Sequence, residues 1–421
     1  MLDLFCRRLS LAIFLMLALS ACGGGGGNDP GKQQQYPTST LKGNITHQQM
    51  SGLISLSGII FSLQPAYDVN YYKVSYESAL PSGATVVHSG LLLVPQKGAG
   101  AASPLLSIQH GTITSQSLAP SNVNLNTPAS VAGDVWAGFA AASFGYVVVM
   151  PDYLGYGDSQ SQFHPYVQAE PLARSAVDLM RAARTLLNGM NVSLNQQVFL
   201  AGYSEGGYAT LATQKYIEGS LGLEFNLVAS EPGAGPYDIS GTVNAVLAAS
   251  DLSGVTKSGY LAFVLESYHA YYDPSTSLST YLTSTAETCA NTYFAGGWYG
   301  ANASGNFETC VNSTVTSSIL NASFLTAISA GDTSVAALTQ GFAANDIYNW
   351  KPQVPTRLFH SPTDEAVPYA NTTKAYTTML ALNSTSVTVQ DCAIPSGTHG
   401  SCSVPFFTDV ISFFNTYVSG L

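Results

Sequence analysis

A serine between glycines marks a position where the local pattern favours a reactive hydroxyl. The stretch Gly202-Tyr203-Ser204-Glu205-Gly206 follows the short apolar run VFLAG and precedes YATLATQKY, which has a helical pattern. A sharp turn from strand to helix strains the serine, and flanking glycines remove side chains that would clash there. The turn also aims the backbone N–H of Glu205 at a developing oxyanion. We therefore interpret Ser204 as a nucleophile rather than a structural serine in a tight turn.

Such a serine needs a base and an orienting carboxylate, and these follow it along the chain in the order Ser, Asp or Glu, His. His399 lies in the loop PSGTHGSC after the last expected strand, where the alternative is a solvent-exposed loop histidine. Asp364 follows the preceding strand in TRLFHSPTDEAVP and would accept the Nδ1–H of His399, holding its tautomer. Asp364 could otherwise cap a helix, and the rival acids are Glu365, Glu231 and Asp391.

A second oxyanion donor is expected in the turn after the apolar run LLSIQ. Gly111 would let the backbone approach a substrate there, and the N–H of Thr112 is the favoured donor. A His-Gly pair at the end of a strand could equally be ordinary turn chemistry. Asp152, in the run VVVMPDY, is interpreted as a structural residue that ties down loops at the strand end.

The elements that must position these residues alternate along the chain. The segment from residue 69 to residue 95 is expected to form a hairpin around Pro81-Ser82-Gly83. The later runs PLLSIQHG, YVVVMPDY, VFLAG, FNLVAS, TRLFH and SVTVQD are short, apolar and bounded by turn residues, which is typical of strands buried on both faces. Helical patterns separate them. The sequence therefore predicts an α/β fold with a mostly parallel, doubly wound sheet.

Residues 240–350 break this alternation. They form a long, irregular segment rich in Ser, Thr, Tyr and Gly between two strands of the expected core. A segment of that length inside a doubly wound sheet is most simply an inserted cap or lid, with a core of residues 51–239 and 351–421 around it. The alternative is a surface decoration without a gating role.

The N-terminus predicts export. Arg7 and Arg8 precede an apolar run that is too short to be a permanent membrane span, and Leu-Ser-Ala-Cys ends it. Residues 1–21 are thus expected to be a lipoprotein signal peptide that leaves Cys22 as the lipidated first residue. The alternative is an ordinary secretion signal. Residues 22–50 begin with a glycine run and are expected to be a flexible tether to a bacterial outer membrane.

The remaining four cysteines form an even set in an exported protein, where disulfides persist. Of three possible pairings the simplest joins neighbours, Cys289 with Cys310 and Cys392 with Cys402, and the second pair would fix the loop that carries His399. No cysteine or histidine cluster indicates a metal. The formal net charge of −11 argues against nucleic acid as a partner.

Taken together, these residues resemble the α/β-hydrolase superfamily, and more narrowly the secretory lipase family. The resemblance rests on GYSEGG (202–207), VVVMPDYLGYGDS (147–159) with HPY (164–166) after it, and SPTDEAVP (361–368), and it spans about residues 70–415. It implies hydrolysis of esters, often acylglycerols, by a monomeric enzyme without cofactor, with the insertion serving as a lid or acyl-binding cap. The alternatives are a serine peptidase of the same fold and a surface-binding lipoprotein without catalysis.

Overall fold

The computed structural model describes residues 35–421 except 81, 114, 128–130, 253–257 and 294–302. The expected signal peptide, the lipidation site Cys22 and the first part of the tether lie outside the described residues. Among the helices that are described, none is both long and apolar enough to cross a membrane.

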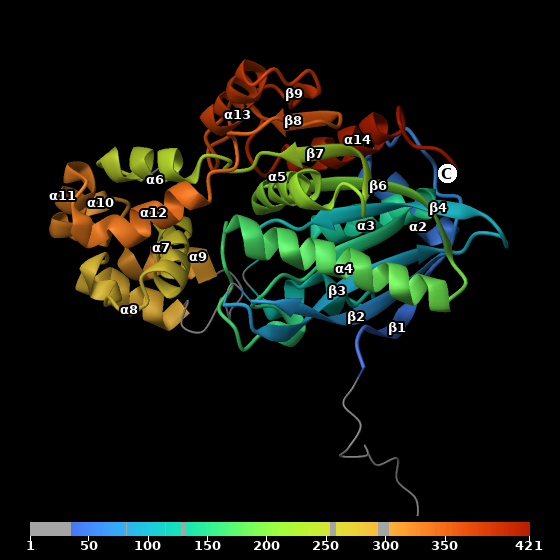
Figure 1. The fold of residues 1–421 in the computed structure, drawn as a ribbon, viewed down its shortest axis with the longest axis horizontal. Helices are drawn as coiled ribbons and strands as arrows, with labels where there is room; N and C mark the ends of the chain where they lie inside the picture. Colours follow the sequence, from blue (N-terminus) through green and yellow to red (C-terminus); the bar gives the residue numbers. More distant parts are fainter. Residues whose placement is uncertain (1–34, 81, 114, 128–130, 253–257, 294–302) are drawn as a thin grey trace, which may run out of the picture. The chain divides into compact units, whose positions relative to one another are not determined.

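The described strands form one sheet of nine, in the order β1-β2-β3-β5-β4-β6-β7-β8-β9 (Figure 1). The pairs between β1, β2, β3 and β5 are antiparallel, and all others are parallel. This confirms the predicted α/β fold with a mostly parallel sheet. The strands are β1 (Thr38–Ile45), β2 (Val69–Ala79), β3 (Thr85–Pro95), β4 (Ala102–Gln109), β5 (Val147–Pro151), β6 (Ser193–Tyr203), β7 (Asn226–Gly233), β8 (Thr356–His360) and β9 (Val387–Asp391).

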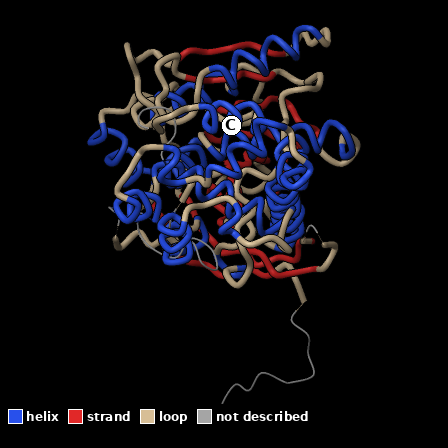
Figure 2. The backbone as a smooth tube through the Cα atoms, turned by 90° about the vertical axis from the view of Figure 1, so that its left-hand side faces the viewer, coloured by secondary structure: helices blue, strands red, loops and turns tan. Residues whose placement is uncertain are grey.

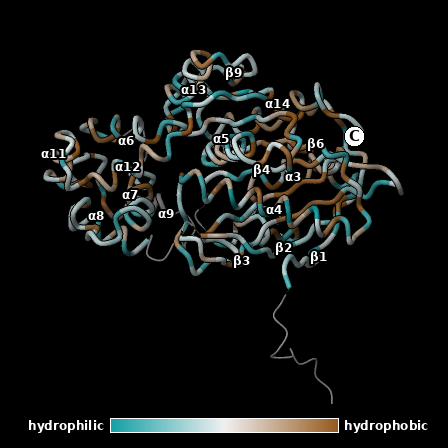
Figure 3. The backbone as a smooth tube through the Cα atoms, in the orientation of Figure 1, coloured by the Kyte–Doolittle hydropathy of each residue, from teal (hydrophilic) through white to brown (hydrophobic). Residues whose placement is uncertain are grey.

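The hydrophobic pattern explains why these strands lie inside. All five residues of β5, VVVMP, are buried, as expected for a strand covered on both faces. The predicted hairpin is present, because β2 and β3 pair from Val69 opposite Pro95 to Ala79 opposite Thr85. Figure 3 shows that the hydrophobic stretches concentrate in the central strands and the helices that cover them.

Helices cover both faces of the sheet. One apolar cluster joins the sheet to α2 (His47–Ser57), α3 (Gly133–Phe144) and α14 (Ser403–Phe414). On the other face lie α4 (Ala169–Gly189) and α5 (Glu205–Tyr216), while α13 (Ala370–Ala381) connects β8 to β9. The sheet is thus doubly wound, and the carboxyl ends of its parallel strands open at one edge, where such folds bind ligands.

Two expectations need correction. The segment between β7 and β8 is largely helical rather than irregular, and Figure 2 shows these helices turned toward the viewer. Its apolar residues lie in short helices among many Ser and Thr residues, so the sequence shows no clear helical period there. The helices are α6 (Ile239–Ala248), α7 (Ser258–Tyr272), α8 (Ser284–Tyr293), α9 (Ala303–Val311), α10 (Thr316–Ile319), α11 (Ala322–Ala330) and α12 (Ala336–Ala344).

The tether was expected to run to residue 50, yet β1 and the start of α2 fall within that range. β1 is an edge strand paired only on the side of β2, and most of its side chains are partly or fully exposed. Its polar sequence, TSTLKGNI, therefore lacks the apolar signal of a buried strand. α2 begins at a capping box in which Thr46 and Gln49 satisfy each other's backbone N–H groups.

Candidate active site

Ser204 lies in a strained turn between β6 and α5. Its backbone has φ 63° and ψ −125°, a conformation that residues with a side chain rarely adopt. The neighbouring glycines are sterically required, because a Cβ at Gly202 would lie 2.6 Å from the carbonyl oxygen of Gln109, and one at Gly206 only 2.1 Å. The turn therefore holds the Ser204 side chain at the carboxyl edge of the sheet.

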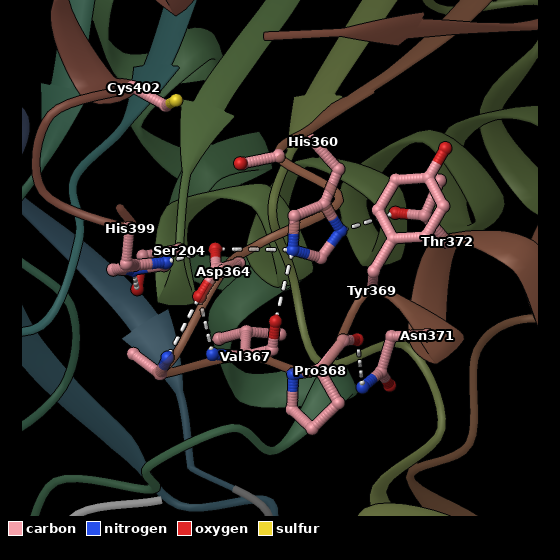
Figure 4. A network of polar contacts seen from close by, with 12 residues as sticks. Ser204, His360, Asp364, Val367, Pro368, Tyr369, Asn371, Thr372, His399 and Cys402 are labelled. Atoms are coloured by element: carbon pink, nitrogen blue, oxygen red, sulfur yellow. Dashed lines mark hydrogen bonds and ion pairs between the residues drawn. The ribbon is translucent and has the colours of Figure 1, made fainter. Parts of the chain in front are cut away.

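A chain of two hydrogen bonds connects Ser204 to a histidine and a carboxylate (Figure 4). The Nδ1 of His399 lies 2.6 Å from the Oδ2 of Asp364, and its Nε2 lies 2.8 Å from the Oγ of Ser204. Because a carboxylate only accepts, Nδ1 carries the imidazole proton and Nε2 is left to accept from the serine hydroxyl. The three residues follow β6, β8 and β9, which end at the same edge of the sheet.

Asp364 is held as a carboxylate by its surroundings. Its side chain is fully buried. Burial by itself would raise the pKa of Asp364, but hydrogen bonds from His360 and His399, together with the backbone N–H of Val367, place that pKa well below its ordinary value. The second carboxylate oxygen accepts from the N–H groups of Ala366 and Val367, at 2.9 and 2.8 Å.

His360, the last residue of the run TRLFH that was predicted as a strand, is a further member of this network and had no predicted role in the site. It lies at the end of β8, fully buried, with Nε2 at 3.2 Å from the Oδ2 of Asp364 and 3.1 Å from the carbonyl oxygen of Val367. A carbonyl only accepts, so Nε2 carries a proton, and the hydroxyl of Thr372 lies at hydrogen-bond distance from Nδ1 (Figure 4). The spacing His-x-x-x-Asp in HSPTD is the local signal that could have found it.

Several bonds fix the loop that carries His399. The disulfide between Cys392 and Cys402 closes this loop, as the simplest pairing had predicted. The carbonyl oxygen of His399 accepts from the hydroxyl of Tyr203, at 2.8 Å, and its N–H donates to the carboxylate of Glu365, at 2.9 Å. Glu365, a rival acid in the sequence, thus bonds the backbone of the loop and leaves the imidazole to Asp364.

The residues named for the oxyanion lie beside Ser204. A Cβ on Gly111 would lie 3.2 Å from the carbonyl oxygen of Tyr203, so the turn after β4 packs directly against the elbow. The N–H of Gly111 donates to the carboxylate of Asp134, at 3.1 Å, and is therefore occupied. Glu205 is the first residue of α5, where N–H groups have no partner within the helix. Thr112 lines the cavity above Ser204.

That cavity has a volume of about 90 Å³ and is mostly apolar. Ser204, His399 and Thr112 are among its polar lining residues. The remaining lining includes Val243 and Val246 of α6 and Leu261 and Val264 of α7, the first two helices of the insertion.

The other acidic residues weighed from the sequence are placed elsewhere. Glu231 is buried in β7, where burial and the nearby Asp409 raise its pKa well above the ordinary value. Asp391 accepts from the hydroxyl of Tyr369 at 2.6 Å. Asp152 is buried and accepts from both the N–H and the hydroxyl of Ser121, which agrees with a structural role. Within the described part of the chain, no group of three or more His, Cys, Asp or Glu side chains is arranged to hold a metal.

The chain is similar to several solved structures over most of its length. A putative hydrolase from Legionella pneumophila is 26% identical, covering 90% of this chain and 97% of its own, with a TM-score of 0.76. The rice cell wall degrading esterase LipA from Xanthomonas oryzae is 25% identical over 90% of this chain and 97% of its own, with a TM-score of 0.73. Candida antarctica lipase A in its closed state, at 16% identity, shares the fold, covering 86% of this chain and 76% of its own with a TM-score of 0.60.

No curated protein sequence matches the chain. A family model described as Secretory lipase matches residues 127–401, about two thirds of the sequence and a span that includes Ser204, Asp364 and His399. The chain therefore belongs to the secretory lipase family, and it is an ester hydrolase.

Proposed function

We propose that this protein hydrolyses carboxylic esters through an acyl-enzyme on Ser204, with His399 as the base and Asp364 as the orienting acid. The observation that carries the proposal is the continuous hydrogen-bonded chain from the serine hydroxyl to the buried carboxylate, with distances of 2.8 and 2.6 Å. The depressed pKa of Asp364 keeps it charged near neutral pH, and a charged partner stabilises the imidazolium that forms during the reaction.

In the proposed reaction, His399 transfers the proton in each step. The Nε2 of His399 takes the Ser204 proton while Oγ attacks the ester carbonyl, and the oxyanion that forms receives hydrogen bonds from the N–H groups of Glu205 and Thr112. The imidazolium then gives its proton to the leaving alcohol, and the C–O bond of the ester breaks. Water, deprotonated by the same nitrogen, attacks the acyl-enzyme, and the proton returns to Ser204 as the carboxylic acid leaves.

The helical insertion supplies the site for the acyl chain in this proposal. Residues 240–350 form a cap domain whose helices α6 and α7 present valine and leucine side chains to the cavity beside Ser204. Residues 51–239 and 351–421 form the hydrolase core. An apolar wall next to the nucleophile binds the hydrocarbon part of an ester and leaves its carbonyl beside Ser204.

The two disulfides and membership of a secretory family indicate an exported protein. We further propose that Cys22 carries a lipid anchor and that the residues after it tether the enzyme to the envelope, because a glycine run separates Cys22 from the first strand. Cys22→Ser should move the protein from the membrane fraction to the soluble exported fraction. An unchanged distribution would remove the anchor from the proposal.

The decisive experiment replaces the nucleophile. Ser204→Ala should lower kcat for p-nitrophenyl butyrate by roughly 10⁵-fold or more while the protein stays folded, because no other group can form the acyl-enzyme. A fluorophosphonate probe should label the parent protein and not the variant. Ser401→Ala, which alters an exposed serine two residues from His399, serves as the matched control and should remain fully active. Unchanged turnover by Ser204→Ala would refute the assignment.

A further inference from the structure

The side chain of Glu205, the residue after the nucleophile, is buried against the imidazole of His164. Its Oε1 lies 2.7 Å from the Nε2 of His164, and both side chains are only 1% exposed. The other ring nitrogen, Nδ1, lies 2.8 Å from the carbonyl oxygen of Leu154. The imidazole is thus held between two acceptors, and one of them belongs to the residue whose N–H is proposed to bind the oxyanion.

The protons of this pair can be counted. The carbonyl of Leu154 only accepts, so Nδ1 of His164 carries a proton. The second proton lies between Nε2 and the carboxyl of Glu205, so the pair has no net charge whichever atom holds it. Without His164, the carboxylate of Glu205 would be buried beside a reaction that itself develops negative charge, and like charges in a region of low dielectric repel strongly.

Four aromatic rings pack around the imidazole of His164. Tyr153, Tyr156 and Tyr166 surround the imidazole, with ring centroids 5.9, 4.9 and 6.2 Å away. Phe263 of α7 stacks on it at 5.9 Å. All three tyrosines and His164 come from the segment YLGYGDSQSQFHPY (153–166), the conspicuous motif that the proposed mechanism leaves unused.

The hydroxyls of these tyrosines all reach the turn after β4. Tyr153 donates to the carbonyl oxygen of residue 110, at 3.1 Å, and Tyr156 donates to that of residue 113, at 2.8 Å. The hydroxyl of Tyr166 lies 3.0 Å from the Oγ1 of Thr112. Burial raises the pKa of Tyr153 and Tyr166 well above the ordinary value, so these hydroxyls keep their protons. One segment therefore holds residues 110–113 in place while its histidine binds Glu205.

We propose that His164 is a positioning residue for the oxyanion site, which it serves by neutralising Glu205 and by packing among the tyrosines that bond residues 110, 112 and 113. This inference rests on the proposed function, because it assigns support to the two N–H donors of that mechanism. His164 touches neither the serine nor the substrate cavity. Its effect should therefore appear in the transition state and leave substrate binding nearly unchanged.

The first test separates charge from packing. His164→Gln removes the imidazole that shares a proton with Glu205 and should lower kcat for p-nitrophenyl butyrate by roughly 10–100-fold, less than the 10²–10³-fold that the loss of a whole oxyanion donor costs, with KM within twofold. Glu205→Gln should lose less kcat than His164→Gln, because a neutral amide can donate to His164. The double variant should recover at least about tenfold over His164→Gln, since no buried charge is then left without a partner.

A transition-state analogue distinguishes this role from a general loosening of the fold. The inhibition constant of an alkylboronic acid, which forms a tetrahedral adduct on a serine, should weaken in parallel with kcat in His164→Gln. His88→Gln is the matched control, because His88 is also buried but lies on β3 and contacts Ser175 of α4. That variant should keep the parent kcat and boronate affinity even where its melting temperature falls.

The second test addresses the tyrosines and does not depend on the folding of His164→Gln. Tyr153→Phe removes only the hydroxyl bond to residue 110 and should lower kcat several-fold at constant KM. Its control is Tyr146→Phe, since the buried hydroxyl of Tyr146 has no hydrogen-bond partner among the described residues. Equal kcat values for Tyr153→Phe and Tyr146→Phe would overturn the inference, as would a folded His164→Gln variant with the parent kcat. Either result, with Ser204→Ala inactive, would leave the proposed mechanism intact.

Discussion

Replacing Asp364 by Asn tests the orienting role of the carboxylate with a change of one atom. The carboxylate accepts four hydrogen bonds: two from backbone N–H groups to Oδ1, and two from imidazole nitrogens to Oδ2. An Asn side chain can keep its oxygen on the two backbone donors. Its NH₂ group then faces the Nδ1 of His399 and the Nε2 of His360, where the parent protein has an acceptor.

This conflict should lower kcat by changing the tautomer of His399. A donor opposite Nδ1 favours the His399 tautomer that is protonated on Nε2, and that nitrogen lies 2.8 Å from the hydroxyl it must deprotonate. The base is then blocked while the fold is preserved. A wrong tautomer in such a triad lowers kcat by roughly 10⁴-fold, which corresponds to about 5 kcal/mol of transition-state stabilisation.

Initial rates with p-nitrophenyl butyrate, measured between pH 5 and 9, would check this value. The matched control is Asp391→Asn, which alters the rival carboxylate at the end of β9 and should leave kcat unchanged. Thermal unfolding of both variants would verify that they fold. A kcat for Asp364→Asn within tenfold of the parent, or an equal loss in Asp391→Asn, would refute the reasoning.

The pKa of Asp364 gives the same experiment a pH dependence. Its folded-state pKa lies below the value in the unfolded chain, because hydrogen bonds from two histidines outweigh burial. A carboxylate of this kind stabilises the fold above roughly pH 4 and loses that contribution as the pH falls through the folded value. The difference in melting temperature between the parent and Asp364→Asn should therefore be constant above pH 5 and shrink below it.

Two further variants test the elbow and the cap. Gly206→Ala should destabilise the protein by about 3 kcal/mol or more, because its Cβ would lie 2.1 Å from the carbonyl oxygen of Gln109. The control is Gly219→Ala, whose Cβ meets nothing within 4 Å and should be neutral. Equal melting temperatures for the two variants would contradict this prediction. Burial and Glu287 raise the pKa of Glu266 to about 7, so the stability of the fold should fall as the pH rises from about 4.5 to about 7. Glu266→Gln should remove that decline, on the order of 2–3 kcal/mol, and a parent melting temperature that is flat from pH 5 to 8 would contradict it.

Local sequence patterns predicted much of the fold. Short apolar runs predicted the parallel strands, because a strand covered on both faces has no polar alternation to disguise it. They missed β1, whose exposed edge position leaves it polar, and the helices of the insertion, whose apolar residues lie among many Ser and Thr. The first miss follows from the exposure of the strand, and the second from the absence of a clear helical period in the insertion.

The sequence by itself determined the order of the elements, the glycine-flanked turn at Ser204, and the presence of an acid and a histidine after the last two strands. Only the tertiary structure decided that Asp364 and not Glu365 faces the imidazole of His399. It also decided that His360 bonds this acid and that His164 pairs with Glu205. The physical reason is distance along the chain. Ser204 and His399 are 195 residues apart, and only the parallel ladder brings their strand ends to one edge. Spacing along a sequence says which residues are available, whereas packing decides which atoms meet.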